Sequence, residues 1–196
     1  MPHDCRCNKC KSVIYAMFFR IYDEIEFKPK FETASVRLAD YEGKKVYQSL
    51  SKIYKALQSC GRNKRFVRVK NLCESDLYIP SKKLLIEIDE SQHFTEERYT
   101  ALKNYPKGFE FSYDVKSYKR MCKKIRSKDP DPKYRNQQRA WYDSVRDFLP
   151  KICPEEVKKV IRIPLGEYKW CDLDHKNKKD VAKFKRLLKS ECIWRK

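Results

Sequence analysis

The chain is short of glycine, of acidic residues and of long apolar runs. Only four glycines occur among its 196 residues, which leaves little sequence for flexible linkers. The longest apolar run, Val13 to Phe19, is far shorter than the roughly 20 residues that a membrane span requires. The amino-terminal residues lack the charged, apolar and small-residue segments of an export signal. These absences predict a soluble, cytoplasmic protein that is neither secreted nor bound to a membrane.

The shortage of acids leaves a large positive charge. The chain has 46 Lys and Arg against 27 Asp and Glu, a formal net charge of +19. Hydrophobic residues make up 41% of it, enough for a folded core, and its length suits one domain with an insertion or two small domains. Such a charge favours a nucleic-acid partner, because lysine and arginine release counterions from phosphates. A plainly soluble cationic protein or an anionic membrane partner are the alternatives.

Nine cysteines, an odd number without an export signal, argue against a disulfide framework. Three of them, Cys5, Cys7 and Cys10, lie within six residues and could hold a structural Zn²⁺. His3 or a distant cysteine would then supply the fourth ligand. The alternative is a frayed terminus that merely contains thiols.

The pattern of apolar residues predicts a mixed α/β protein. Residues 14–25 fit either a helix or a strand, residues 26–43 read as loop, and residues 44–59 form an amphipathic helix. Strands are predicted at 66–69, 76–79, 84–89 and 160–164, helices at 95–105 and 181–188, and mainly helical structure across 107–150. The predicted division is an amino-terminal segment, 1–43, with the cysteine cluster, followed by a domain at 44–196 with a helical insertion at about 107–150.

Three acids stand apart from the many that lie among lysines. Strand alternation puts Glu87 and Asp89 on one face, and a hairpin closed around residues 80–83 would bring Asp76 close to Glu87. Converging carboxylates repel one another unless a divalent cation lies between them. Such a site suits phosphodiester hydrolysis, which needs an activated water and a neutralised phosphate. The alternative is a half-polar edge strand with solvated acids.

These residues belong to a longer motif. It reads Asp76-Leu77-Tyr78-Ile79-Pro80, then Leu84-Leu85-Ile86-Glu87-Ile88-Asp89, then Glu90-Ser91-Gln92-His93-Phe94. The motif resembles the PD-(D/E)XK nuclease superfamily, in the branch related to very-short-patch-repair endonucleases, and the match covers about residues 66–105. The resemblance implies a restriction-endonuclease-like αβββαβ core. It also implies a Mg²⁺- or Mn²⁺-dependent endonuclease that acts on DNA in restriction, repair or defence.

Carried over to this chain, the resemblance makes Asp76 and Glu87 metal ligands. Asp89 stands where most of the superfamily has lysine, and an aspartate cannot stabilise negative charge. Asp89 would therefore ligate the metal or orient its water, or another cation, such as Lys82 or Lys83, would take over. A third alternative is an inactive nuclease fold that only binds nucleic acid.

Gln92 and His93 follow the third predicted strand directly. As functional residues they would reach the scissile phosphate or its attacking water, with His93 as general base or phosphate contact. As structural residues they would cap the next helix or hold the turn.

Basic residues supply the expected binding surface for double-stranded DNA, because lysine and arginine at this density usually contact phosphates. The candidates are Arg62, Lys64, Arg65, Arg68, Lys119, Arg120, Lys123, Lys124, Arg135 and Arg139. Segment 134–139 also carries the Asn, Gln and Arg side chains that read base edges. The first hypothesis is thus a metal-dependent nuclease. An inactive nucleic-acid-binding module and a zinc-containing interaction protein are the alternatives.

Overall fold

The computed structural model of the chain describes residues 6–60, 63–128 and 131–188. Its central element is a four-stranded sheet with the strand order β1-β2-β3-β4. The strands are β1 (Glu26–Phe27), β2 (Leu77–Ile79), β3 (Leu84–Asp89) and β4 (Lys159–Pro164). The first three pair antiparallel, whereas β4 runs parallel to β3, so the sheet is mixed.

Seven α-helices accompany the sheet in the described part of the chain. They are α1 (Asn8–Ile21), α2 (Tyr47–Cys60), α3 (Glu96–Lys103), α4 (Val115–Ile125), α5 (Arg135–Asp147), α6 (Leu149–Ile152) and α7 (Lys178–Leu188). Short 3-10 helices are η1 (Leu38–Tyr41), η2 (Pro80–Lys82), η3 (Ser91–His93), η4 (Leu165–Glu167) and η5 (Trp170–Asp172).

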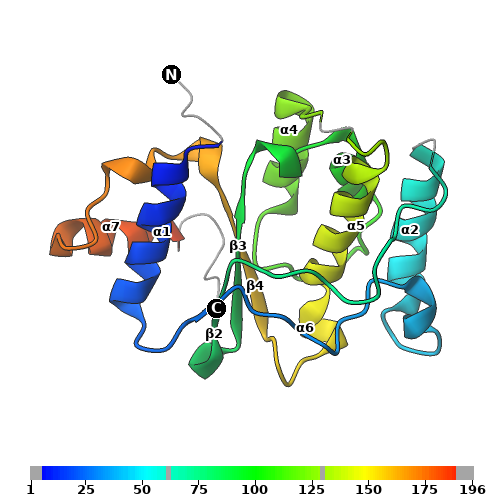
Figure 1. Cartoon of the computed structure of the whole chain (residues 1–196), viewed down its shortest axis with the longest axis horizontal. Helices are drawn as coiled ribbons and strands as arrows, with labels where there is room; N and C mark the ends of the chain where they lie inside the picture. Colours follow the sequence, from blue (N-terminus) through cyan, green and yellow to red (C-terminus); the bar gives the residue numbers. More distant parts are fainter. Residues whose placement is uncertain (1–5, 61–62, 129–130, 189–196) are drawn as a thin grey trace.

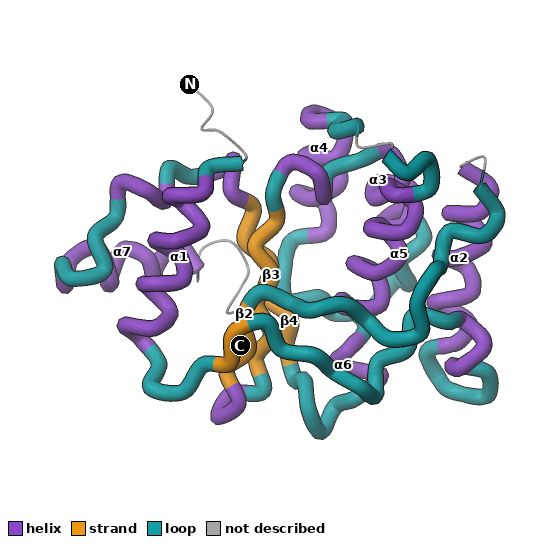
Figure 2. Tube along the Cα trace, in the orientation of Figure 1, coloured by secondary structure: helices purple, strands orange, loops and turns teal. Residues whose placement is uncertain are grey.

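Helices cover both faces of the sheet (Figures 1 and 2). On one face α1 and α7 pack in a core that includes Ile86, Ile88 and Phe184. On the other face α2, α3, α5 and α6 share a core that includes Leu85 and Trp141. All six residues of β3 are buried, as expected for a strand covered on both faces.

The alternation of β3 places its two acids. Ile86 and Ile88 belong to the core beneath α1, whereas Leu85 belongs to the core beneath α5. Glu87 and Asp89 are on the same side of the strand as Leu85 because successive side chains point to opposite faces. Both acids therefore face α5.

Most of the predicted elements are present. The 44–59 helix corresponds to α2, the 84–89 strand to β3 and the 160–164 strand to β4. Thr95 caps α3, and its hydroxyl oxygen accepts a hydrogen bond from the Arg98 amide at 3.1 Å. The segment left open as helix or strand is helical in α1.

The predicted strand at 66–69 is wrong, because these residues are not in a strand. The edge beside β2 is taken by β1, which lies in a segment expected to be loop. Phe66 is buried, but Val69 is 49% exposed, so the alternating pattern does not mark a half-buried strand here.

Candidate active site

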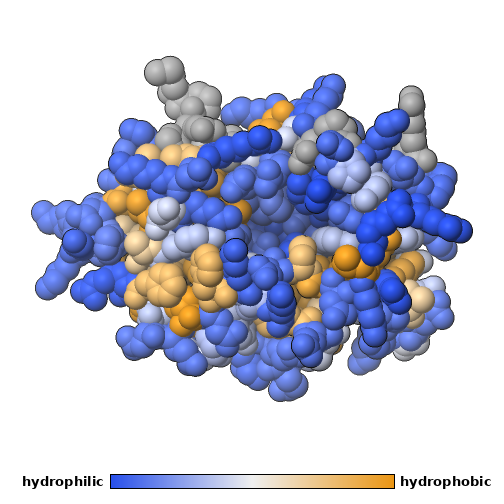
Figure 3. Space-filling model, in the orientation of Figure 1, coloured by the Kyte–Doolittle hydropathy of each residue, from blue (hydrophilic) through white to orange (hydrophobic). Residues whose placement is uncertain are grey.

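A cleft of about 470 Å³ opens where β3 ends, between α1 and α5. Figure 3 shows this face hollowed near its middle, with hydrophilic residues around the depression. Its acidic lining comes from Glu74, Asp76, Glu87 and Glu90, and Gln92 and His93 also line it. The cationic lining consists of Lys11, Lys28, Arg135, Arg139 and Arg146. The cleft thus combines carboxylates with a larger number of cationic side chains.

Asp76 lies at the start of β2 and is held by three donors. Its Oδ2 accepts a hydrogen bond from the Ile88 amide at 2.7 Å. Its Oδ1 accepts one from the Tyr15 hydroxyl at 2.9 Å and lies 2.9 Å from Lys11 Nζ. Lys11 also lies 3.7 Å from Glu90 Oε1. Burial disfavours the charged amine, but the charges of Asp76 and Glu90 outweigh it and raise the pKa of Lys11.

Glu87 is buried at the floor of the cleft and is incompletely paired. Arg146 Nε lies 3.3 Å from its Oε1, close enough for an ion pair. The orientation does not allow a hydrogen bond, and Oε1 has no such partner in the described residues. Burial raises the pKa of Glu87, an effect that the charges of Arg146 and Arg162 only partly offset. An unsatisfied carboxylate oxygen here is available to a cation.

Asp89 has a different environment from the other two predicted metal ligands. Only 1% of the residue is exposed, and both carboxylate oxygens accept hydrogen bonds from Arg162 Nη1, at 2.7 and 3.0 Å. The Tyr118 hydroxyl donates to its Oδ2 at 3.0 Å, and His93 Nδ1 lies 3.4 Å from its Oδ1. Asp89 is therefore engaged by protein groups beneath the cleft.

His93 connects this buried layer with the cleft. Its Nδ1 lies 2.9 Å from Asp143 Oδ2, while the ring lines the cleft with 18% of the side chain exposed. Burial disfavours the imidazolium, but the charges of Asp143 and Asp89 outweigh it and raise the pKa of His93. The histidine charge, in turn, helps to hold the pKa of Asp143 well below its usual range despite burial. Both shifts favour the imidazolium–carboxylate form of the pair.

Arg162 is the centre of the buried layer. It contacts three carboxylates: Asp89, Asp143 at 3.3 Å and Asp147 at 2.7 Å. Asp147 also accepts hydrogen bonds from Arg98 Nη2, Tyr105 and Tyr113, at 2.7, 2.6 and 2.6 Å. We call Arg162, Arg98, Asp89, Asp143 and Asp147 the Arg162 network. All five residues are buried.

Two groups of three residues in the described chain have metal-ligand atoms within 4.8 Å of one another. One is Asp89, His93 and Asp143, and the other is Cys7, Cys10 and Cys171. Asp76 and Glu87 belong to neither, so the three predicted acids do not form one such group. Cys5, also predicted as a zinc ligand, lies outside the described residues.

Of the nine predicted nucleic-acid contacts in the described residues, two line the cleft and seven do not. Arg135 and Arg139 line it, and Arg139 also donates a hydrogen bond to the Gln92 carbonyl at 3.2 Å. Arg68 packs over the Tyr134 ring at 4.5 Å, and Lys123 over the Tyr99 ring at 5.0 Å. Lys64, Arg65, Arg120 and Lys124 are exposed and Lys119 is half-buried, whereas Arg62 lies outside the described residues.

Gln137 and Lys83 do not have the surroundings that their candidate roles require. Gln137 is buried, and its amide donates to the backbone carbonyls of Leu57 and Asn63, which leaves it unable to read a base. Lys83 precedes β3 and pairs with Glu155 at 3.6 Å. It lies at the opposite end of the strand from the cleft, as does Lys82.

Sequence reasoning missed Asp143, Arg146 and Arg162. A signal was present, because Arg162 interrupts a strand that is otherwise apolar, and a buried arginine requires carboxylate partners. The i, i+3 spacing of Asp143 and Arg146 also places these charges together on the helix that carries the buried Trp141.

Chemically, the cleft offers carboxylates for a hard cation, an oriented imidazolium and several cations for a polyanion. Comparisons of the chain with family models, curated proteins and solved structures give no match. Among the described helices, none has the length and apolar character needed to cross a bilayer.

Proposed function

We propose that the protein is a divalent-metal-dependent nuclease that hydrolyses phosphodiester bonds in DNA. The observation that carries this proposal is the Oε1 of buried Glu87, which has no hydrogen-bond partner among the described residues and lies next to Asp76 in a cleft lined with cationic residues. The charge of Asp76 is near enough to contribute to the raised pKa of Glu87. Two such carboxylates in one cleft are favourable when they share a cation.

The residues present fit a hard divalent cation. Asp76 and Glu87 would hold it through carboxylate oxygens, the donors that Mg²⁺ and Mn²⁺ prefer. When bound, the cation would supply Lewis acidity, lowering the pKa of water and offsetting phosphate charge. The unsatisfied oxygen of Glu87 would gain the partner that it otherwise lacks.

In this proposal Asp89 is a positioning residue. Its oxygens are taken by Arg162 and Tyr118, and it helps to keep His93 charged. Stabilisation of negative charge, the task of the missing lysine, falls to Lys11 and Arg146. Both line the cleft and lie beside its acids.

His93 acts on the substrate through Nε2, because its Nδ1 faces Asp143. Asp143 fixes the ring orientation and favours the imidazolium. A charged His93 donates a hydrogen bond to a phosphate oxygen or a proton to the leaving oxygen. The proposed role is therefore that of acid or phosphate contact rather than general base.

The element order supports the same proposal. The sequence α1, β1, β2, β3, crossover helices and β4 fits the αβββαβ order of the superfamily that the motif resembles. In this alignment α1 is the first helix, and α2 is an insertion between β1 and β2.

The binding partner is proposed to be duplex DNA. Arg135 and Arg139 line the cleft next to Gln92 and His93, and the +19 charge adds a general attraction to phosphates. The exposed basic side chains of α4 extend the cationic surface beyond the cleft.

The test is a plasmid-cleavage assay with Mg²⁺ and Mn²⁺, combined with calorimetric titration of Mn²⁺. We expect the wild type to cleave and Glu87→Gln to lose both cleavage and Mn²⁺ binding. Glu155→Gln is the matched control, since that side chain is 95% exposed and remote from the cleft. Unchanged Mn²⁺ affinity in Glu87→Gln would refute the assignment.

A second function, an inactive nucleic-acid-binding module, is favoured by one observation. The position of the superfamily lysine holds an aspartate that is fully engaged with Arg162. This alternative predicts no cleavage with either metal, together with duplex binding whose affinity falls steeply with salt. Measuring both properties on the wild type separates the two functions.

A further inference from the structure

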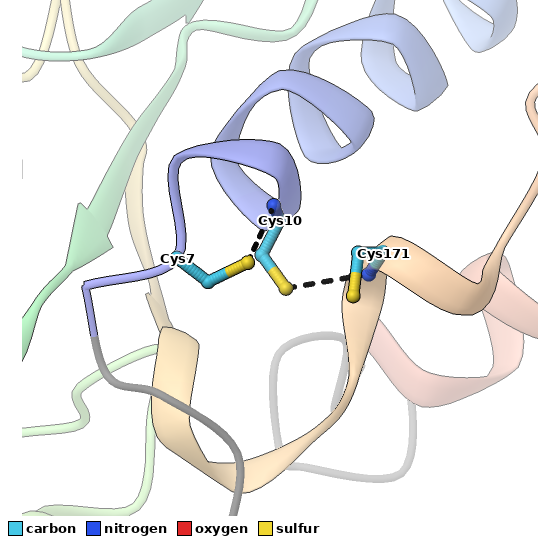
Figure 4. Close-up of side chains that lie close together, drawn as sticks. All are labelled: Cys7, Cys10 and Cys171. Atoms are coloured by element: carbon cyan, nitrogen blue, oxygen red, sulfur yellow. Dashed lines mark hydrogen bonds between the residues drawn. The ribbon is translucent and has the colours of Figure 1, made fainter.

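Three cysteines from opposite ends of the sequence meet on the side of the sheet that carries α1. Cys7 is the N-cap of α1, Cys10 lies in the first turn of that helix, and Cys171 lies in η5. Their sulfur atoms all lie within 4.8 Å of one another. Figure 4 shows the three side chains converging between the start of α1 and η5.

Backbone amides are directed at two of these sulfur atoms. The Cys10 amide donates to Cys7 Sγ at 3.3 Å, and the Cys171 amide donates to Cys10 Sγ at 3.3 Å. Amide donors stabilise negative charge on sulfur, as does the positive end of the α1 dipole next to Cys7. These donors orient the two sulfur atoms, but burial raises the pKa of Cys10 to about 12, so zinc would displace a thiol proton when it binds.

We propose that Cys7, Cys10 and Cys171 bind a structural Zn²⁺ that joins α1 to η5. Sulfur atoms on a tetrahedral zinc, about 2.3 Å from each ligand, lie roughly 3.8 Å apart. Side-chain rotation and a small approach of the two segments would convert the present spacing to that geometry. Three sulfurs occupy three corners of the tetrahedron, and the fourth is left for a water molecule.

A metal explains the cluster better than a disulfide does. A disulfide uses two cysteines and leaves the third without a role, whereas all three sulfurs are mutually close. Thiolate-rich tetrahedral sites select zinc over the hard cations proposed for the cleft. The two metal sites are therefore chemically distinct.

The position of the cluster gives the zinc a consequence for the cleft. Lys11 follows Cys10 directly and contacts Asp76 and Glu90. α1 and η5 share one core, which includes Ile14 and Trp170. Zinc bound at the start of α1 would fix the first turn of the helix and thereby hold Lys11 over Asp76.

The experiment begins with protein purified without chelator and in reducing buffer. Elemental analysis should find about one zinc per wild-type chain, and none in Cys10→Ser or Cys171→Ser. Cys60→Ser is the matched control, because Cys60 is exposed at the end of α2, and it should keep its zinc. Glu87→Gln should also keep its zinc, which separates this site from the cleft.

Cobalt substitution of the wild type tests the ligands without relying on the variants. Co²⁺ should produce the visible bands of a tetrahedral site and a sulfur-to-cobalt charge-transfer band with the intensity of at least three thiolates. Chelation should lower the wild-type melting temperature by at least about 2–4 °C, because the metal binds only the folded chain. It should not change that of Cys171→Ser.

Three results would overturn the proposal. They are wild-type protein that neither contains nor takes up zinc or cobalt, zinc retained in Cys171→Ser, and a Cys7–Cys10 disulfide found by alkylation and mass spectrometry. If a variant fails to fold, the cobalt spectrum of the wild type still decides between thiolate and oxygen ligands.

Discussion

Two groups of charged side chains meet at His93 and differ in how completely they are paired. In the Arg162 network every carboxylate oxygen has a hydrogen-bond partner, and burial is nearly complete. Among the acids of the cleft, Glu87 keeps an oxygen without a hydrogen bond. The same residue types thus form a fully hydrogen-bonded structural unit in the Arg162 network and an incompletely hydrogen-bonded site in the cleft. Incomplete pairing, rather than burial, distinguishes the site.

The buried charges near the cleft are equal in number for the two signs only when His93 is protonated. Four buried carboxylates, Glu87, Asp89, Asp143 and Asp147, face three buried guanidiniums, Arg98, Arg146 and Arg162. A protonated His93 brings the two signs into balance, in agreement with its raised pKa. His93 thus belongs to the structural unit through Nδ1 and to the site through the rest of its ring.

Replacing His93 tests both roles and should have the largest effect on cleavage among substitutions that keep the proposed metal ligands. We expect His93→Gln to reduce cleavage by about 10²–10⁴-fold, the usual contribution of a positioned acid or base. Wild-type activity should fall as the pH rises through the raised pKa of His93, since the imidazolium is the active form. A pH–rate profile checks this expectation, and an activity that increases over that range would identify a base instead.

Removing the centre of the network should cost most in stability. Arg162→Met leaves three buried carboxylates without their shared partner, and we expect a loss of about 3–5 kcal/mol in unfolding free energy. Arg120→Met is the control, because the Arg120 side chain is 71% exposed and its ion pair with Asp114 is long, at 3.9 Å. That change should stay within about 0.5 kcal/mol. Urea unfolding of both variants measures the difference.

Replacing Glu87, the buried acid of the cleft, should not lower the unfolding free energy. Glu87→Gln removes a carboxylate that is buried and incompletely paired, so we expect stability at pH 7 to be unchanged or to rise by about 1 kcal/mol. A raised pKa means that the folded wild type holds its proton more tightly than the unfolded chain. The contribution of Glu87 to stability therefore declines as the pH rises from its unfolded pKa through its folded pKa.

That decline should be absent from Glu87→Gln, and unfolding curves of both proteins across pH 4–8 test it. The contribution of Asp143 to stability has the opposite pH dependence, because the pKa of Asp143 is lowered. Its contribution is present above its unfolded pKa and is lost as the pH falls through the folded pKa. A Glu87→Gln protein destabilised by several kcal/mol would place Glu87 within the structural unit.

A small stability effect is also expected for Lys11→Met. The Lys11 and Asp76 side chains are 28% and 18% exposed, so solvent screens their ion pair, and its loss should cost less than about 1 kcal/mol. Mn²⁺ affinity should increase because Asp76 loses a competing cation, while cleavage should fall because the phosphate loses a positive neighbour. Calorimetry and kinetics on one preparation test these opposite changes, and a fall in both would contradict the proposed role of Lys11.

The sequence predicts local features well and long-range partners poorly. The alternation of Leu84 to Asp89 correctly predicts a strand with Glu87 and Asp89 on one face. It does not reveal that Arg162, 73 residues away from Asp89, binds both of that residue's oxygens. Pairing across such a separation depends on the packing of the whole sheet.

Two further differences have the same origin. The residues at 66–69 have the apolar and polar pattern of a strand, but β1 occupies the sheet edge, and no local signal reports this competition. Cys171 approaches Cys10 from 161 residues away, so the sequence could predict only that a distant cysteine might join the cluster. Local pattern gives the type of element, and topology decides its neighbours.

The parallel pairing of β3 with β4 has a consequence for how the molecule folds. Parallel strands require a long crossover, and here α3 to α6 lie between the two strands. Contacts between residues far apart in the sequence form late, because the chain must first lose loop entropy. Glu87, Asp89 and Arg162 come together only in that step. We therefore expect the nascent chain to possess helices and the β2–β3 hairpin well before it possesses the cleft to which nuclease activity is proposed.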